Sequence, residues 1–390
     1  MFWIRRTSWC LIILIAVLRL LITPSMAATT DDNIKQQLKR HYTTGAAVVV
    51  AKDGEIVYEY YYGYSDKASK RIISADTYFR LASVTKMVTG VAAMQLVEKG
   101  ELTLDADISE YLGYTVQNPY HRNTPVTLRQ LMTHTSALNP HGGYTNLNNT
   151  LRELISTDHK RKANWYNEVS GSKYRYSNFG AGIIGSLIES ITGQNIQDVV
   201  DSNVFMPLNI TAAYSASLLP DPENIATLYN ADGTISDSRA SSLDKAWDSS
   251  VNPDEHFRIT VGSLWMKPVD LCKIGMMLCN RGRLDNAEIL KESTVLEMES
   301  EQRGKGGITA KTPYGICIQH EQTLIDGKTI YGHQGLIDGI LCNLYYDPET
   351  NLVFVFCSNG CHNQMENRVA HITRKIFGIV WKEYCVDRNC

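Results

Sequence analysis

Hydrophobic and polar positions form β-rich runs near both ends of the chain. Residues 45–64 contain two such runs on either side of Lys52-Asp53-Gly54, and an Asp-Gly pair between strand-like runs is typical of a tight hairpin turn. Residues 339–359 repeat the arrangement around Asp347-Pro348. The pattern therefore predicts two antiparallel hairpins, one from each end of the chain.

Helical patterns dominate the region between the hairpins. Segments such as "TLRQLMTHTSAL" and "NFGAGIIGSLIESITG" carry helical apolar spacing and are separated by loops rich in Pro, Asn and Gly. A helix is predicted to begin at Ser83, and another to close the chain over "NRVAHITRKIFGIVWKEY". The simplest fold is α+β: an antiparallel sheet flanked by helices, with a mainly helical insert. We expect the sheet region at about 31–105 and 255–390, and the helical region at about 106–254.

The N-terminus has the features of a secretory signal. Two arginines precede an apolar run, and "SMAA" offers the small residues that a signal peptidase needs. We predict a signal peptide over residues 1–28, a mature chain that starts near Ala28 or Thr29, and a secreted or periplasmic location. A retained anchor is the alternative, but Arg19 interrupts the run, which falls short of the ~20 residues of a membrane span. No stable membrane span is expected after cleavage.

Composition narrows the class of protein. The chain has 390 residues, of which 44% are hydrophobic and 20% charged, and its formal net charge is -3. Such a chain can bury a large core, as one large or two interleaved domains. The balanced charge lacks the basic footprint of a nucleic-acid-binding protein, so no nucleic-acid partner is expected.

The number of cysteines is consistent with an exported protein. Removal of Cys10 with the signal leaves eight cysteines, at positions 272, 279, 317, 342, 357, 361, 385 and 390. We predict at least one disulfide among them. Cys272 and Cys279 lie seven residues apart on one predicted helix, about 10.5 Å by helical rise, too far to pair with each other. The other pairings stay open. A metal site at "CSNGCH" is disfavoured because no CxxC pair elsewhere would complete it.

One motif suggests a catalytic site. In "FRLASVTKMVTG", Ser83 and Lys86 lie one helical turn apart, so the amine can reach the hydroxyl. The lysine would act as a base only if its surroundings lowered its pKa from about 10.4. Alone the motif is weak, because a serine that caps a helix beside an exposed lysine gives the same letters.

Two further segments strengthen the catalytic interpretation of Ser83 and Lys86. "YRYSNFGAG" places Tyr176 and Asn178 at the head of a helix, and "YGHQGLIDG" places His333 and Gly335 before a strand. Individually they have ordinary explanations, since Asn favours helix caps and His333 could be a hydrogen-bonded core histidine. Together with the serine and lysine, they resemble the β-lactamase-related serine hydrolases, which include class C β-lactamases, D-alanyl-D-alanine carboxypeptidases, D-aminopeptidases and esterases. Five blocks match in order over roughly residues 45–359.

The resemblance implies a β-lactamase/transpeptidase-like fold and a role for each catalytic residue. Ser83 would be the acylated nucleophile, and Lys86 would take part in proton transfer to and from its hydroxyl. Tyr176 would be the general base if its pKa were lowered. The backbone N–H groups of Ser83 and Leu336 would form the oxyanion hole. No metal or organic cofactor is implied.

The resemblance also implies substrate contacts. Asn178 would donate to the amide carbonyl of the substrate, and the strand edge at His333 and Gly335 would bind it. His333 stands where class C β-lactamases carry a lysine, so binding of a substrate carboxylate is expected to depend on pH. His134, in "LMTHTSAL", is expected to be structural.

Two further departures from the family pattern bear on the site. Ala137 replaces a usual glycine, and Trp265 is a candidate for lining a distinctive pocket.

These expectations converge on an exported acyl-serine hydrolase that acts on peptide-like amides. D-alanyl-D-alanine carboxypeptidase or D-stereospecific peptidase activity is the first hypothesis, with a cell-wall peptide or a β-lactam as the small-molecule partner. A β-lactamase or carboxylesterase on the same scaffold is the alternative within the class. A penicillin-binding sensor that is acylated but barely turns over is the alternative from another class.

Overall fold

The fold was derived from a computed structural model that describes residues 28–159, 162–236, 248–337, 339–362 and 364–386. The predicted signal segment, except Ala28, lies outside the described residues. The strands are β1 Gly45–Lys52, β2 Glu55–Asp66, β3 Arg71–Ile72, β4 Phe79–Arg80, β5 Ala212–Ala213, β6 Trp265–Met266, β7 Arg283–Leu284, β8 Ala287–Glu288, β9 Gln319–Glu321, β10 Ile330–Ile337, β11 Ile340–Asp347, β12 Leu352–Ser358, β13 Met365–Glu366 and β14 Val369–Ala370.

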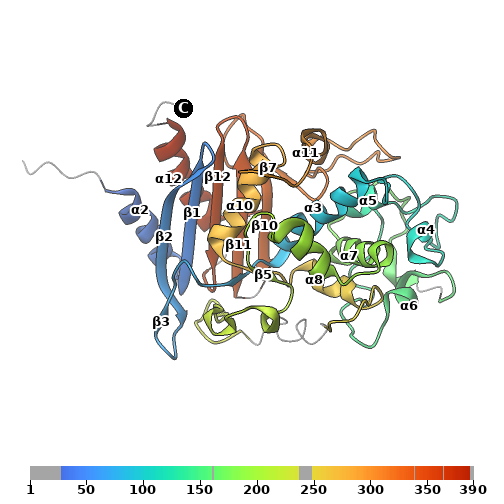
Figure 1. Cartoon of the computed structure of the whole chain (residues 1–390), viewed down its shortest axis with the longest axis horizontal. Helices are drawn as coiled ribbons and strands as arrows, with labels where there is room; N and C mark the ends of the chain where they lie inside the picture. Colours follow the sequence, from blue (N-terminus) through green and yellow to red (C-terminus); the bar gives the residue numbers. More distant parts are fainter. Residues whose placement is uncertain (1–27, 160–161, 237–247, 338, 363, 387–390) are drawn as a thin grey trace, which may run out of the picture.

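The helices include both sheet-flanking helices and those of the middle region. They are α2 Thr30–Arg40, α3 Thr85–Glu98, α4 Ser109–Leu112, α5 Leu128–Met132, α6 Leu151–Ile155, α7 Asn178–Thr192, α8 Ile196–Val200, α10 Pro268–Cys279, α11 Glu292–Glu299 and α12 His371–Trp381. Helices α4 to α8 lie together beside the sheet, as Figure 1 shows. The predicted α+β arrangement, with a helical region between two sheet-forming ends, is confirmed.

The main sheet joins strands from both ends of the chain. In the described residues its order is β3-β2-β1-β12-β11-β10-β9, and each of these neighbouring pairs is antiparallel. The first hairpin turns at Asp53 and Gly54, with φ angles of 54° and 85°, which is the positive-φ conformation that an Asp-Gly turn favours. The second joins β11 to β12. Both predicted hairpins are confirmed.

Side chains of the central strands alternate between two hydrophobic layers. Ala47 and Val49 face the larger core with α3 and α10, whereas Val48 and Val50 face the smaller core with α2 and α12. All four are buried, which is the pattern of a strand covered on both faces. Figure 1 shows α2 and α12 together at one flank of the sheet. The sheet is therefore a rigid middle layer, and α3 is supported against it.

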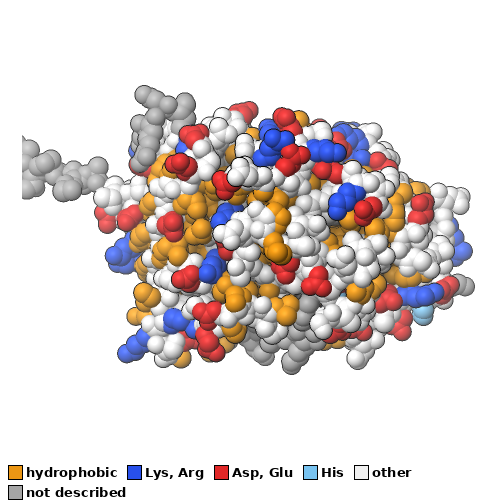
Figure 2. Space-filling view, viewed as in Figure 1, with side chains coloured by type: hydrophobic (Ala, Val, Ile, Leu, Met, Phe, Trp, Pro, Cys, Tyr) orange, Lys and Arg blue, Asp and Glu red, His pale blue; other side chains and the backbone are white. Residues whose placement is uncertain are grey.

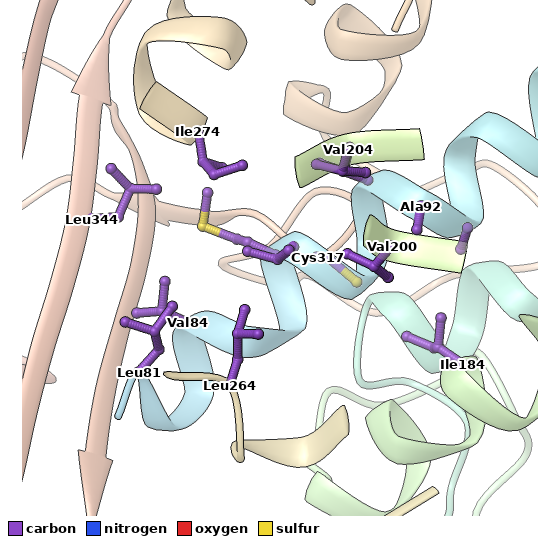
Figure 3. Packing of buried hydrophobic residues seen from close by; sticks show 14 of the residues in the cluster. Leu81, Val84, Ala92, Ile184, Val200, Val204, Leu264, Ile274, Cys317 and Leu344 are labelled. Atoms are coloured by element: carbon purple, nitrogen blue, oxygen red, sulfur yellow. The ribbon is translucent and has the colours of Figure 1, made fainter. Parts of the chain in front are cut away.

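The core beside the nucleophile segment is dense and apolar. Figure 3 shows Leu81, Val84 and Leu264 near Leu344 of β11 and Ile274 of α10. All five residues are fully buried. Interiors of this kind are close-packed, so the turn before α3 is held in one conformation.

The molecular surface carries both signs of charge. On the face in Figure 2, Lys and Arg side chains are interspersed with Asp and Glu, as the small net charge predicts. None of the helices in the described part of the chain is both long enough and apolar enough to cross a membrane.

The strand register offers one pairing for the predicted disulfide. Cys342 of β11 and Cys357 of β12 are direct partners, both are buried, and their thiol sulfurs lie 2.8 Å apart. Directly opposed residues have Cα atoms about 4.5–5.5 Å apart, within the range that a disulfide spans. We expect peptide mapping of exported protein, alkylated without reduction, to recover these two cysteines in one cross-linked peptide. Alkylation of all eight thiols would contradict this prediction and the wider expectation of a disulfide.

Candidate active site

Ser83 lies in a sharp turn at the start of α3. It is the middle residue of a single 3-10 turn, Ala82–Val84, and α3 begins at Thr85. The predicted helix start is thus a 3-10 turn that runs into the helix. Ala82 has a φ of 46°, a conformation that costs a non-glycine residue free energy and persists only where its surroundings enforce it. The N–H of Leu81 donates to Leu264 O over 2.8 Å, which helps to hold the turn.

Lys86 is close to Ser83 and buried. Its Nζ lies 2.9 Å from Ser83 Oγ and 2.6 Å from the carbonyl oxygen of Val261, and the residue is 2% exposed. Burial disfavours the charged ammonium and lowers the pKa of Lys86 to about 7. A substantial fraction of the lysine is therefore an uncharged amine near neutral pH, as a base requires.

Tyr176 approaches Ser83 from the other side. Its hydroxyl donates to Ser83 Oγ over 2.9 Å. The tyrosine precedes α7, which begins where the Ser177 hydroxyl accepts from the Gly180 N–H, a favoured N-cap arrangement. Burial raises the pKa of Tyr176, so its resting state is a neutral phenol. This direction is opposite to the lowered pKa on which its expected role as general base depends.

Histidine and tyrosine rings enclose Tyr176. The ring of His134 lies 4.3 Å from that of Tyr176, and the N–H of Ser177 donates to His134 Nδ1 over 3.3 Å. Tyr314 packs edge-on against His134 with centroids 5.0 Å apart. His134 is 3% exposed, and its place behind Tyr176 suits the structural role expected for it.

Gly335 allows strand β10 to pass close to the nucleophile. A Cβ at this position would lie 2.1 Å from Leu81 O and 3.1 Å from the Ser83 nitrogen. Any larger residue would push β10 away from the turn, so the glycine is explained by close backbone approach. Leu336 is the next residue along β10, which brings its backbone near the same turn.

Asn178 is the first residue of α7 and is partly buried. Its Oδ1 is shielded from solvent, yet in the described structure it has no hydrogen-bond partner. Buried polar atoms are nearly always paired. The unpaired oxygen can accept from a substrate N–H, whereas the predicted donation by Asn178 would come from its Nδ2 and stays a prediction.

His333 lies in a buried environment that affects its charge. It is 2% exposed, and burial, with the nearby Lys86, lowers its pKa to about 3. Burial therefore favours the neutral imidazole at physiological pH, and the pH dependence expected of carboxylate binding stays a prediction. Trp265 departs from expectation: it is 3% exposed within β6 and the main core, so it does not line an open pocket.

Two contributors to the site were not recognised from the sequence. The Val261 carbonyl is a backbone group, and its side chain gives no signal of that function. Tyr314 lies in "KTPYGICIQH", five residues before β9 Gln319–Glu321, and no motif of the sequence singled it out. Ala137 has a φ of 63°, which explains why a glycine would suit its position. No cluster of three potential metal ligands occurs in the described ranges.

Comparisons with known proteins match this architecture. A model of the Beta-lactamase family matches residues 30–376. Esterase EstB from Burkholderia gladioli is 32% identical over 206 residues, which cover 47% of this chain and 49% of EstB. The chain thus matches about half the length of that relative. Protein flp from Staphylococcus aureus strain N315 is 27% identical over 42% of this chain and 33% of its own length.

Solved structures extend the likeness over most of the chain. The octameric penicillin-binding protein homologue from Pyrococcus abyssi has a TM-score of 0.70 at 19% identity, covering 90% of this chain and 76% of that one. D-amino acid amidase from Ochrobactrum anthropi SV3, complexed with L-phenylalanine amide, has a TM-score of 0.68 at 19% identity and covers 91% and 98%. At these identities the comparisons establish the fold.

Proposed function

Because this chain belongs to the Beta-lactamase family, we propose that it is an exported acyl-serine hydrolase of peptide-like amides, such as D-alanyl-D-alanine peptides or other D-amino acid amides. The proposal rests above all on one observation: Ser83 Oγ lies 2.9 Å from both Lys86 Nζ and Tyr176 OH. A hydroxyl that contacts a buried base and a second proton-carrying group has the arrangement of an activated nucleophile.

Acylation would begin with proton transfer from Ser83 Oγ to the uncharged Lys86 amine. The oxygen would form a bond to the substrate carbonyl carbon, and the carbonyl electron pair would move onto its oxygen. When the carbon–nitrogen bond breaks, the Tyr176 hydroxyl would give its proton to the leaving amine, and the Lys86 ammonium would restore it. Water would then cleave the acyl ester by the reverse proton path.

The strand edge of β10 would align the substrate. Strand β9 pairs with β10 only at Ile330, Tyr331 and Gly332, which leaves the part of that edge after Gly332 without β9. An extended peptide can add to such an edge through backbone hydrogen bonds. With Gly335 this close to the Ser83 turn, the N–H groups of Ser83 and Leu336 would stabilise the oxyanion.

A pocket of about 600 Å³ lies beside the loop that carries Tyr314, since Thr312 and Pro313 line it. Its charged lining residues are two cations, Lys311 and Arg368, and two carboxylates, Glu299 and Glu301. Since neutral His333 cannot supply a cation, Lys311 and Arg368 are the candidates in this lining for attracting a substrate carboxylate.

A carboxylesterase is the second candidate function. The observation that favours it is the 32% identity with Esterase EstB, although the match covers 49% of that protein. Esters need less help at the leaving group than amides, so the same serine, lysine and tyrosine could serve both reactions.

A hydrolysis panel separates these functions. We expect purified protein to release D-alanine from D-Ala-D-Ala peptides or ammonia from D-amino acid amides, with the Ser83→Ala variant as the inactive control. Turnover of short p-nitrophenyl esters alone would favour the esterase, and hydrolysis of a chromogenic cephalosporin alone a β-lactamase. Durable labelling by a fluorescent penicillin without any turnover would instead indicate a sensor.

A further inference from the structure

We infer that His333 is a positioning residue that acts through Tyr314 on Tyr176, rather than a residue that contacts the substrate. This inference rests on the proposed function, because it concerns how the proposed nucleophile is activated. It assigns Tyr314 a role in the site. It also gives His333 a role different from that of the lysine that class C β-lactamases carry at this position.

Hydrogen bonds fix the tautomer of His333. Its Nδ1 lies 2.8 Å from the carbonyl oxygen of Gln334. A carbonyl oxygen can only accept, so Nδ1 carries the proton. In a neutral imidazole the other nitrogen, Nε2, is then an acceptor. Tyr314 OH lies 3.2 Å from Nε2, so the tyrosine donates its proton to the histidine.

This pair leaves His333 without a polar atom for a substrate. Both ring nitrogens are engaged by groups of the protein, and the residue is 2% exposed. Tyr314 is 4% exposed, so the hydrogen bond is shielded from water. Shielded bonds are costly to leave unmade, because the buried partner then lacks any replacement.

The ring of Tyr314 packs against three other rings near the nucleophile. Its ring centroid lies 5.9 Å from Tyr174, 6.2 Å from Tyr176 and 5.0 Å from His134. His134 in turn lies 4.3 Å from Tyr176. A shift of Tyr314 therefore reaches Tyr176 by two routes. Because the Tyr176 hydroxyl must stay 2.9 Å from Ser83 Oγ, a small displacement of this ring is sufficient to slow acylation.

Backbone hydrogen bonds fix the loop that carries Tyr314, and the Tyr314 hydroxyl interacts with both His333 and Tyr174. The Tyr314 N–H donates to Thr312 Oγ1 over 3.1 Å, and the Cys317 N–H donates to Met132 O over 3.1 Å. Together with the contact to Tyr174, the bond to His333 then sets the direction of the side chain. His333 thus orients Tyr314 in the way that a residue behind an active site orients the catalytic group.

The test is a double-mutant cycle with His333→Asn, Tyr314→Phe and the double variant. Asparagine keeps a donor for Gln334 O but lacks the Nε2 acceptor, and phenylalanine lacks the donor. The readout is the rate of Ser83 labelling by a fluorophosphonate, which needs no knowledge of the natural substrate. We expect each single variant to label roughly tenfold more slowly, and the double variant to be no slower than either single.

Two further variants test whether slower labelling results merely from a disrupted fold. His333→Gln, whose side-chain oxygen can accept near the Nε2 position, should recover most of the wild-type rate. Tyr58→Phe is the matched control, since it also removes one tyrosine hydroxyl, which donates to Asp31 Oδ1 over 2.7 Å, on β2 at the other side of the sheet from β10; it should label at the wild-type rate.

Substrate kinetics distinguish positioning from contact. If His333 acts through Tyr314, His333→Asn should lower kcat equally for carboxylate-bearing and neutral substrates and leave KM within about twofold. Multiplicative losses in the double variant, or a rise in KM for carboxylate-bearing substrates alone, would overturn the inference. Wild-type protein that is never labelled at Ser83 would instead refute the proposed function, so the two failures are distinguishable.

Discussion

Replacing Ser83 with alanine is expected to abolish covalent labelling by a serine-directed fluorophosphonate and all hydrolysis. The substitution removes the only oxygen that Lys86 and Tyr176 share, at 2.9 Å from each. No bond to the substrate carbon can then form. The free energy of unfolding should change by less than about 1 kcal/mol, because the lost bonds lie in a half-buried turn that water can reach.

Ser263→Ala is a demanding control for this experiment. Ser263 follows Gly262 close to the nucleophile turn and is fully buried, and its Oγ has no hydrogen-bond partner in the described structure. Labelling of this variant at the wild-type rate would show that the loss in Ser83→Ala is specific. Undiminished labelling of the Ser83→Ala protein, mapped to another serine, would refute the assignment of the nucleophile.

Local sequence signals were sufficient to predict much of the fold. The Asp53-Gly54 turn and the alternating positions around Val48 specify a hairpin through short-range chemistry. Helix α7 likewise has an N-cap at Ser177 and a positive-φ glycine at Gly193. The short strands β4 to β6 could not be predicted, because each contains two residues and depends on partners far away in the chain.

Sequence motifs predicted which residues form the site but not their protonation states. The motif letters identified Ser83, Lys86 and Tyr176, and the structure brings these three together. Burial decides which of them is the base, and burial is a property of the assembled core. It lowers the pKa of Lys86 to about 7 and that of His333 to about 3 while it raises the pKa of Tyr176. The expected role of Tyr176 had assumed a lowered pKa, and that of His333 an imidazole that can carry charge near neutral pH.

The burial of Lys86 leads to the prediction that Lys86→Met yields a protein that is inactive but more stable at neutral pH. In the unfolded chain the lysine has its usual pKa of 10.5, whereas in the folded protein the pKa is about 7. Between these values the unfolded state binds a proton that the folded state does not, so the lysine destabilises the fold and the penalty shrinks as the pH rises. At pH 7 the penalty is about 4 kcal/mol.

Methionine removes this penalty but also loses the contacts to Ser83 Oγ and Val261 O, which costs about 2 kcal/mol. We therefore expect urea unfolding to show a gain of about 2 kcal/mol at pH 7 and a loss near pH 10. At pH 10 the folded lysine is uncharged and the pH lies close to the unfolded pKa of 10.5, so the penalty has fallen below about 1 kcal/mol and the lost contacts dominate. Labelling of Ser83 should fall at least ~10²-fold. Lys35→Met, at an exposed position of α2, should show neither effect. A stability difference that does not reverse sign between pH 7 and pH 10 would mean that Lys86 is charged in the folded protein, and the proton path would then have to start from another group.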